Sequence, residues 1–131
     1  MKVVLDCNVL ISAARTDGVC RAVITEVVRH HEVVLSTPIL DEYRAVAMRS
    51  EHARARQTAL AVIAELESVA LLVEPVDPPQ HLPDADDTTY LGTALAADAD
   101  VLITGNVRDF PEHASGGVGI MTPRAFLDRK G

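Results

Sequence analysis

The stretch MKVVLDCNVLISA, residues 1–13, decides the fold class of this chain. Its apolar run, residues 3–5, ends abruptly at Asp6, and Asn8 follows two residues later. A run this apolar predicts a strand that is buried on both faces, as strands are in parallel sheets. Open α/β sheets bind ligands at the carboxyl ends of such strands. Asp6 is therefore expected either to face a site or only to cap the helix that follows.

The rest of the chain alternates runs that suit strands with runs that suit helices. The expected strands are residues 2–5, 33–35, 70–73, 101–104 and 118–121. The expected helices are a short one before residue 16, then 19–31, 38–48 with Thr37 as N-cap, one from there to about 68, 84–98, and a last one opened by Thr122 and Pro123. This alternation predicts an α/β fold with a parallel sheet covered on both faces. Residues 1–131 are expected to form a single domain, because a chain of this length builds one core.

The composition bounds the cellular setting. Cys7 and Cys20 have no partners at the spacing of a zinc site or a disulfide framework, so both are expected to be reduced thiols that pack as small apolar groups. No apolar run approaches the length of a membrane span, and the first residues lack the pattern of a signal peptide. These features predict a cytoplasmic protein with no membrane partner.

The charges are unevenly distributed along the chain. The net charge of −7 argues against simple electrostatic binding of nucleic acid. Residues 44–56, called here the arginine-rich segment, contain four arginines and His52 against one acid, Glu51. Residues 74–109 contain eight acids against one base, Arg108.

Two further acids lie on the apolar faces of expected helices. Glu42 has Ile39 and Val46 as helical neighbours, which places it on the edge of an apolar face, although a lone glutamate there is commonly just solvated. Asp87 precedes Leu91 and Leu95 by four and eight residues, so it shares their buried face.

The neighbours of Asp87 follow a different phase. Asp86 aligns with Tyr90 and Thr93 instead of with the buried face. The plain alternative for all acids in this first helical turn is stabilisation by the helix dipole. An inward acid at the start of a helix, near an acid at a strand end, points instead to a cleft.

Polar residues also follow the expected fourth strand, where Thr104 and Asn106 come directly after an apolar run. Carboxylates that converge at one sheet edge raise each other's pKa, and a divalent cation removes that conflict. An all-oxygen set favours Mg²⁺ or Mn²⁺ over Zn²⁺, and such ions serve phosphoryl chemistry. The expected metal ligands are Asp6, Glu42 and Asp87.

Four segments together resemble a PIN-domain ribonuclease, most closely the VapC-like toxins of toxin–antitoxin pairs. They are VVLDCNVLISA with Asp6, STPILDEYRAV with Glu42, DADDTTYLGTALAADADVLITGN with Asp87 and Thr104, and the closing MTPRAFL. The resemblance implies a three-layer PIN-like fold with strand order 3-2-1-4-5. It also implies Mg²⁺- or Mn²⁺-dependent cleavage of single-stranded RNA by Asp6, Glu42 and Asp87, with Asn8, Thr104 and Asn106 in support. A homodimer and a separate antitoxin are further implications.

One departure from the family pattern leaves alternatives open. Many members have an aspartate where this chain has Asn106, so either Asp109 supplies the fourth charge or the site works with three acids. A catalytically inactive PIN-like module that binds RNA or a partner is the main rival function. A haloacid-dehalogenase-type phosphohydrolase needs a second acid at Asn8 and an internal lysine, and a P-loop protein needs a Gly-Lys-Ser/Thr motif; the chain has none of these. The arginine-rich segment is expected to be either a solvated helix face or a track for RNA phosphates.

Overall fold

The computed structural model describes residues 1–129 and has one five-stranded sheet in the order β3-β2-β1-β4-β5. The strands are β1 (Lys2–Leu5), β2 (Glu32–Leu35), β3 (Leu71–Leu72), β4 (Val101–Ile103) and β5 (Gly119–Met121). All four strand pairs are parallel. The predicted α/β class and the 3-2-1-4-5 order are therefore confirmed.

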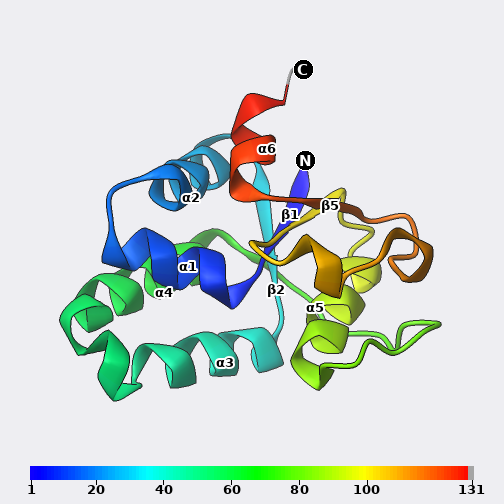
Figure 1. Cartoon of the computed structure of the whole chain (residues 1–131), viewed down its shortest axis with the longest axis horizontal. Coiled ribbons are helices and arrows are strands. Elements are labelled where there is room, and N and C mark those ends of the chain that lie inside the picture. The colour runs from blue at the N-terminus through cyan, green and yellow to red at the C-terminus, as the bar shows by residue number, and fades with distance from the viewer. Residues whose placement is uncertain (130–131) are drawn as a thin grey trace.

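Helices cover both faces of this sheet, as Figure 1 shows. They are α1 (Cys7–Arg15), α2 (Val19–His30), α3 (Thr37–Ala47), α4 (Arg56–Val69), α5 (Ala85–Ala96) and α6 (Pro123–Asp128). The helices α1 to α4 pack against one another, whereas α5 packs on β1, β2 and β4 from the other side of the sheet. The result is the expected three-layer arrangement. None of the helices in the described part of the chain has the length and apolarity needed to cross a bilayer.

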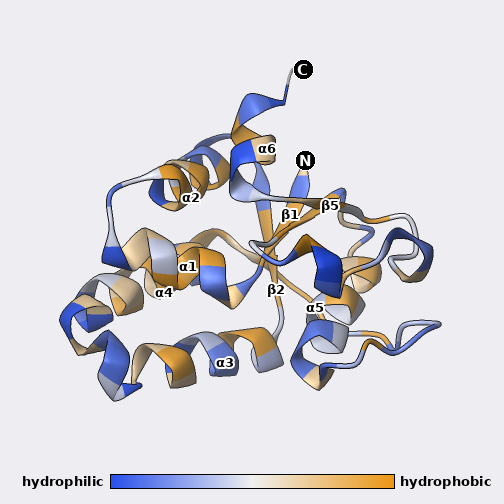
Figure 2. Ribbon diagram, viewed as in Figure 1, coloured by the Kyte–Doolittle hydropathy of each residue, from blue (hydrophilic) through white to orange (hydrophobic). Residues whose placement is uncertain are grey.

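The core lies between these layers and is built mostly from aliphatic side chains. Residues 3–5 are completely buried, as are residues 33–35 of β2. Figure 2 shows the apolar residues concentrated on the strands and on the helix faces that meet them. The four aromatic side chains of the chain are all buried as well: Tyr43, Tyr90, Phe110 and Phe126.

The register of the sheet places the ends of β1 and β4 side by side. Leu5 pairs with Ile103, and the Asp6 amide donates to the Ile103 carbonyl at 2.9 Å. The Thr104 amide continues the next ladder by donating to the Met121 carbonyl at 2.9 Å. Asp6 and Thr104 thus lie next to each other, directly after the carboxyl ends of β1 and β4. The strand order reverses at this point, which is where open α/β sheets bind ligands.

The arginine-rich segment does not form the continuous helix that the sequence predicts. A 3₁₀ helix, η1 (Ser50–Ala55), stands between α3 and α4, and His52 within it has non-helical angles (φ −107°, ψ 17°). The last carbonyls of a helix lack hydrogen-bond donors within it. The Arg56 guanidinium is the donor here, to the carbonyls of Ala47, Met48 and Arg49 at 3.0–3.3 Å. The chain can therefore turn sharply after α3.

Two expected helix starts are also shifted. Ser36, and not Thr37, is the N-cap residue of α3, and its hydroxyl is committed to Thr93 at 2.9 Å. Asp84 precedes α5 as its N-cap, where its carboxylate accepts from the Asp86 amide at 2.8 Å. Between β4 and β5 the chain forms two short 3₁₀ helices, η2 (Val107–Asp109) and η3 (Glu112–Ala114).

Candidate active site

Asp6 is held by β4 and not by the helix that follows it. It occupies the N-cap position of α1, but within residues 1–129 its carboxylate makes no capping hydrogen bond. Its Oδ2 instead accepts from the Thr104 hydroxyl at 2.7 Å, and the side chain is 8% exposed. Burial raises the pKa of Asp6, while the Thr104 hydroxyl and the nearby amides of Asn8 and Cys7 oppose that rise. Although buried, Asp6 is among the residues that line a cavity.

Thr104 works as a fixed donor to Asp6. Its side chain is completely buried, and its Oγ1 accepts from the Asn106 amide at 3.0 Å. A hydroxyl has a single proton, so an oxygen that accepts from Asn106 presents that proton to Asp6. Asn106 therefore supports the site through its backbone, while its side chain is exposed. Asn8 joins the same edge of the sheet, since its Oδ1 accepts from the Gly105 amide at 3.4 Å.

Glu42 faces the same region from α3. Its Oε1 accepts from the hydroxyl of Tyr90, a buried residue of α5, at 2.8 Å. Burial is the main reason that the pKa of Glu42 rises to about 6, and the charges of Asp86 and Asp6 add to the rise. The Tyr90 hydroxyl works in the opposite direction. Glu42 is thus a half-buried carboxylate with one oxygen fixed, and not a solvated one.

Asp87 faces Asp6 and Glu42 from the start of α5. Burial raises the pKa of Asp87 to about 7, and the charges of Asp84, Asp6, Asp109 and Glu42 add to that rise. The half-buried position agrees with the predicted phase, since Leu91 one turn later is completely buried.

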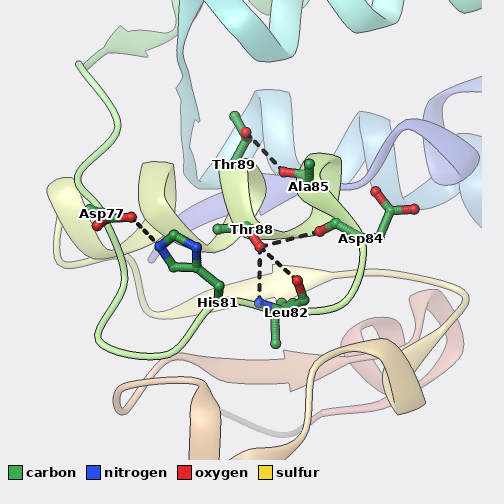
Figure 3. Close-up of polar contacts among 7 residues, drawn as sticks. All are labelled: Asp77, His81, Leu82, Asp84, Ala85, Thr88 and Thr89. Atoms are coloured by element: carbon green, nitrogen blue, oxygen red, sulfur yellow. Dashed lines mark hydrogen bonds and ion pairs between the residues drawn. The ribbon is translucent and has the colours of Figure 1, made fainter.

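The loop before α5 fixes where Asp87 lies. Figure 3 shows the Thr88 hydroxyl among the backbone groups that precede the helix. Its Oγ1 accepts from the Leu82 amide at 3.0 Å and lies 3.2 Å from the Asp84 carbonyl. His81 and Asp77 pair across the same loop at 2.5 Å, but both are exposed. These hydrogen bonds fix the first turn of α5, and so they fix the position of Asp87 in that turn.

One cavity of about 460 Å³ collects most of these side chains. Asp6, Asn8, Glu42 and Asp87 line it. Thr104, Asn106 and Asp109 do not appear in its wall: Thr104 lies behind Asp6, and Asp109 borders a neighbouring depression that Asp87 shares. Of the two candidates for a fourth ligand, neither side chain reaches the cavity.

The residues fit a hard divalent cation in chemistry, although they do not form a closed cage. Within the described residues, no three His, Cys, Asp or Glu side chains cluster tightly enough to hold a metal ion. Mg²⁺ keeps several waters and commonly binds through one or two carboxylates, so it does not need such a cluster. The donors around the cavity are oxygens, and the charge of Asp6 raises the pKa of both Glu42 and Asp87. A bound cation would relieve that mutual repulsion.

Sequence reasoning missed residues on both sides of this cavity. Asp86 lines it and its charge raises the pKa of Glu42, although it was predicted only to align with Tyr90 and Thr93 and was not expected to be a site residue. Asp86 is exposed, as its phase away from Leu91 predicts, but Tyr90 and Thr93, which align with it, are as buried as Leu91. An aromatic residue four positions after Asp86 was the available signal. Three basic side chains also line the cavity, and they were not placed there in advance: Arg15, Arg49 and His52.

The fold and the acid-lined cavity define an α/β protein with a carboxylate site at the switch point of a parallel sheet. The chain belongs to the PIN-domain family, because the model described as PIN domain matches residues 2–108. A search of curated protein sequences gave no match.

Two solved structures share the fold. VapBC2 from Rickettsia felis, bound to a DNA fragment from its promoter, superposes with a TM-score of 0.66 at 12% identity, over 93% of this chain and 98% of that chain. VapBC-1 from nontypeable Haemophilus influenzae gives a TM-score of 0.62 at 19% identity, over 95% of this chain and 99% of that chain. At such identities the likeness establishes the fold.

Proposed function

We propose that this protein is a metal-dependent endoribonuclease that cleaves single-stranded RNA, and that it is the toxin of a toxin–antitoxin pair. The observation that carries the proposal is the shared cavity of Asp6, Glu42 and Asp87, with Asp6 held by Thr104. PIN domains are generally nucleases, and the family membership of this chain supports phosphodiester hydrolysis.

Asp6, Asp87 and Glu42 are the residues that would hold Mg²⁺ or Mn²⁺. The ion, when bound, supplies an activated water and neutralises charge on the phosphate. Thr104 orients Asp6 through the 2.7 Å hydrogen bond. Tyr90 fixes Oε1 of Glu42, so that this carboxylate is held where it can orient a water or take its proton. In the hydrolysis the water oxygen bonds to phosphorus, a P–O ester bond breaks, and the leaving oxygen gains a proton.

The partners in this proposal are RNA, a cognate antitoxin and a second copy of the chain, in the cytoplasm. The solved structures of similar fold are named as VapBC complexes, which supports an antitoxin. Exposed apolar side chains near the arginine-rich segment, Met48 at 57% and Leu60 at 38%, offer surface for it. Leu71 and Leu72 on the edge strand β3 are also exposed, which supports self-association of the chain.

The test is cleavage of a random single-stranded RNA pool in Mn²⁺, in EDTA, and by Asp6→Asn in Mn²⁺. We expect cutting only in the first case. Asp41→Asn is the matched control, because Asp41 is an exposed acid on the same helix as Glu42. Equal cutting in EDTA, or by Asp6→Asn, would refute the metal mechanism.

A catalytically inactive PIN-like module that binds RNA or a partner is the second candidate. The observation that favours it is the absence of a fourth acid, since Asn106 offers Thr104 its backbone amide and no charge. No cleavage in Mn²⁺ by a folded protein that still binds RNA would favour this candidate.

A further inference from the structure

The cavity that contains the acids has a second, basic end. Arg15, Arg49 and His52 line it together with the acids, and we call these three side chains the basic rim. The rim borders a smaller depression that Arg15 and His52 share, so the surface continues beyond the acids.

Two neighbouring segments run from the acidic end to the rim. Asn8 and Arg15 lie seven residues apart along α1, and Glu42 and Arg49 lie seven residues apart along α3 and its end. Helices α1 and α3 pack against each other. Seven residues of helix advance by about 10 Å, so the backbone of Arg15 lies roughly that far along α1 from the backbone of Asn8. Both ends of these segments line the same cavity, so a strand that lies along it can contact both.

The arginines of the rim are uncommitted, unlike others nearby. In the part of the chain that the structure describes, neither the Arg15 nor the Arg49 guanidinium makes a hydrogen bond or an ion pair. Arg44 pairs with Glu67 at 2.8 Å, and Arg56 is used on the carbonyls at the end of α3. The structure thus separates arginines that hold the fold from two that are free to bind a ligand.

His52 adds a third wall to the rim. Its side chain is 12% exposed, and its Nδ1 is buried without a hydrogen-bond partner among the described residues. Nε2 of the same ring lies 3.9 Å from Oε1 of Glu51. The backbone of His52 departs from helical angles within η1, so the rim lies at the turn between α3 and α4.

We propose that the basic rim binds a phosphate that flanks the scissile phosphate of a single-stranded RNA. This inference rests on the proposed function and extends it to a second subsite. Guanidinium groups match phosphate oxygens in pairs, and the rim supplies the positive charge that a chain of net charge −7 otherwise lacks. The acids receive the bond to be cut while the rim holds its neighbour, and so fixes the strand along the cavity.

The experiment compares three substrates made around a bond that the wild type cuts: the dinucleotide with one phosphate, and the same dinucleotide with a second phosphate at either its 5′ or its 3′ end. For the wild type we expect kcat/KM to rise about tenfold with one of the added phosphates. Arg15→Gln and Arg49→Gln should bring this ratio close to one, whereas Arg15→Lys and Arg49→Lys should restore part of it. Arg29→Gln is the matched control, an exposed arginine on α2 outside the cavity.

Binding without turnover separates this proposal from the proposed function. In EDTA, the slope of log affinity against log salt for a single-stranded RNA should fall by about 0.7 in Arg15→Gln, the value for one lost phosphate contact. A wild type that cuts no RNA would refute the nuclease proposal, and the salt slope would still decide the rim. An added-phosphate ratio and a salt slope that match the wild type in both glutamine variants would show that the rim binds no RNA phosphate.

Discussion

Replacing Thr104 by valine tests how Asp6 is held. Valine keeps the shape of threonine but removes the hydroxyl that donates to Asp6 and accepts from the Asn106 amide. A hydrogen bond to a charged group contributes about 1.5–3 kcal/mol, and the Asn106 amide, which is near the surface, regains part of its loss from water. We therefore expect Thr104→Val to lower the free energy of unfolding by about 2–3 kcal/mol.

Urea unfolding in EDTA at pH 7.5 measures this loss. For a chain of this length it corresponds to a fall in Tm of about 8 °C. Thr104→Ser keeps the hydroxyl and removes one buried methyl group, so it should cost only about 1 kcal/mol. The Thr104 hydroxyl stabilises the ionised form of Asp6. The extra cost of valine over serine should therefore shrink as the pH falls and Asp6 becomes protonated.

A double-mutant cycle with Asp6→Asn isolates the pair itself. We expect a coupling of about 1 kcal/mol or more between the two sites, because asparagine retains an acceptor but not the charge. Equal stabilities of the valine and serine variants, or a coupling near zero, would show that Thr104 does not hold Asp6.

Four more predictions concern the same site. The pKa of Asp87 in the folded state is about 7, above its ordinary value of 3.8. The folded state therefore resists ionisation of Asp87 and loses stability as the pH rises from about 4 to 7. In a series of Tm measurements in EDTA, Asp87→Asn should flatten this loss. Mg²⁺ or Mn²⁺ should stabilise the wild type by roughly 2.7 kcal/mol at a hundredfold excess over Kd, and calorimetry should find no such response in Asp87→Asn. Asp109→Asn should keep most RNA cleavage, and Asn106→Asp should keep cleavage while tightening Mn²⁺ in a titration; a loss in Asp109→Asn as complete as in Asp6→Asn would place Asp109 among the ligands. Expression of the wild type without an antitoxin should slow bacterial growth and Asp6→Asn should relieve it, whereas harmless expression of active enzyme would contradict the toxin proposal.

The sequence predicts the parts of this structure that depend on local pattern. The apolar run before Asp6 and the one before Thr104 predict buried parallel strands, and both are buried. The strand order follows from the family resemblance, and the sheet confirms it. The phase of Asp87 on α5 is also correct, because hydrophobic periodicity reports which side of a helix meets the sheet.

The rest depends on contacts that no local pattern records. Asp86 was missed as a lining residue because one buried face was assumed for a helix in which both Tyr90 and Leu91 are buried. The break at His52 is accompanied by contacts of Arg56, whose side chain reaches back to the end of α3. Arg15 and Arg49 are far apart in the chain. They line the same cavity because α1 packs on α3.

The burial of every aromatic ring limits how this protein could tell one RNA from another. Proteins that read unpaired bases commonly stack them on exposed aromatic side chains. This chain has two tyrosines, two phenylalanines and no tryptophan, and all four rings are in the core. Under the proposed function, selection of a cleavage point would then depend on the shape of the RNA, such as an open loop that can enter the cavity, more than on the identity of its bases.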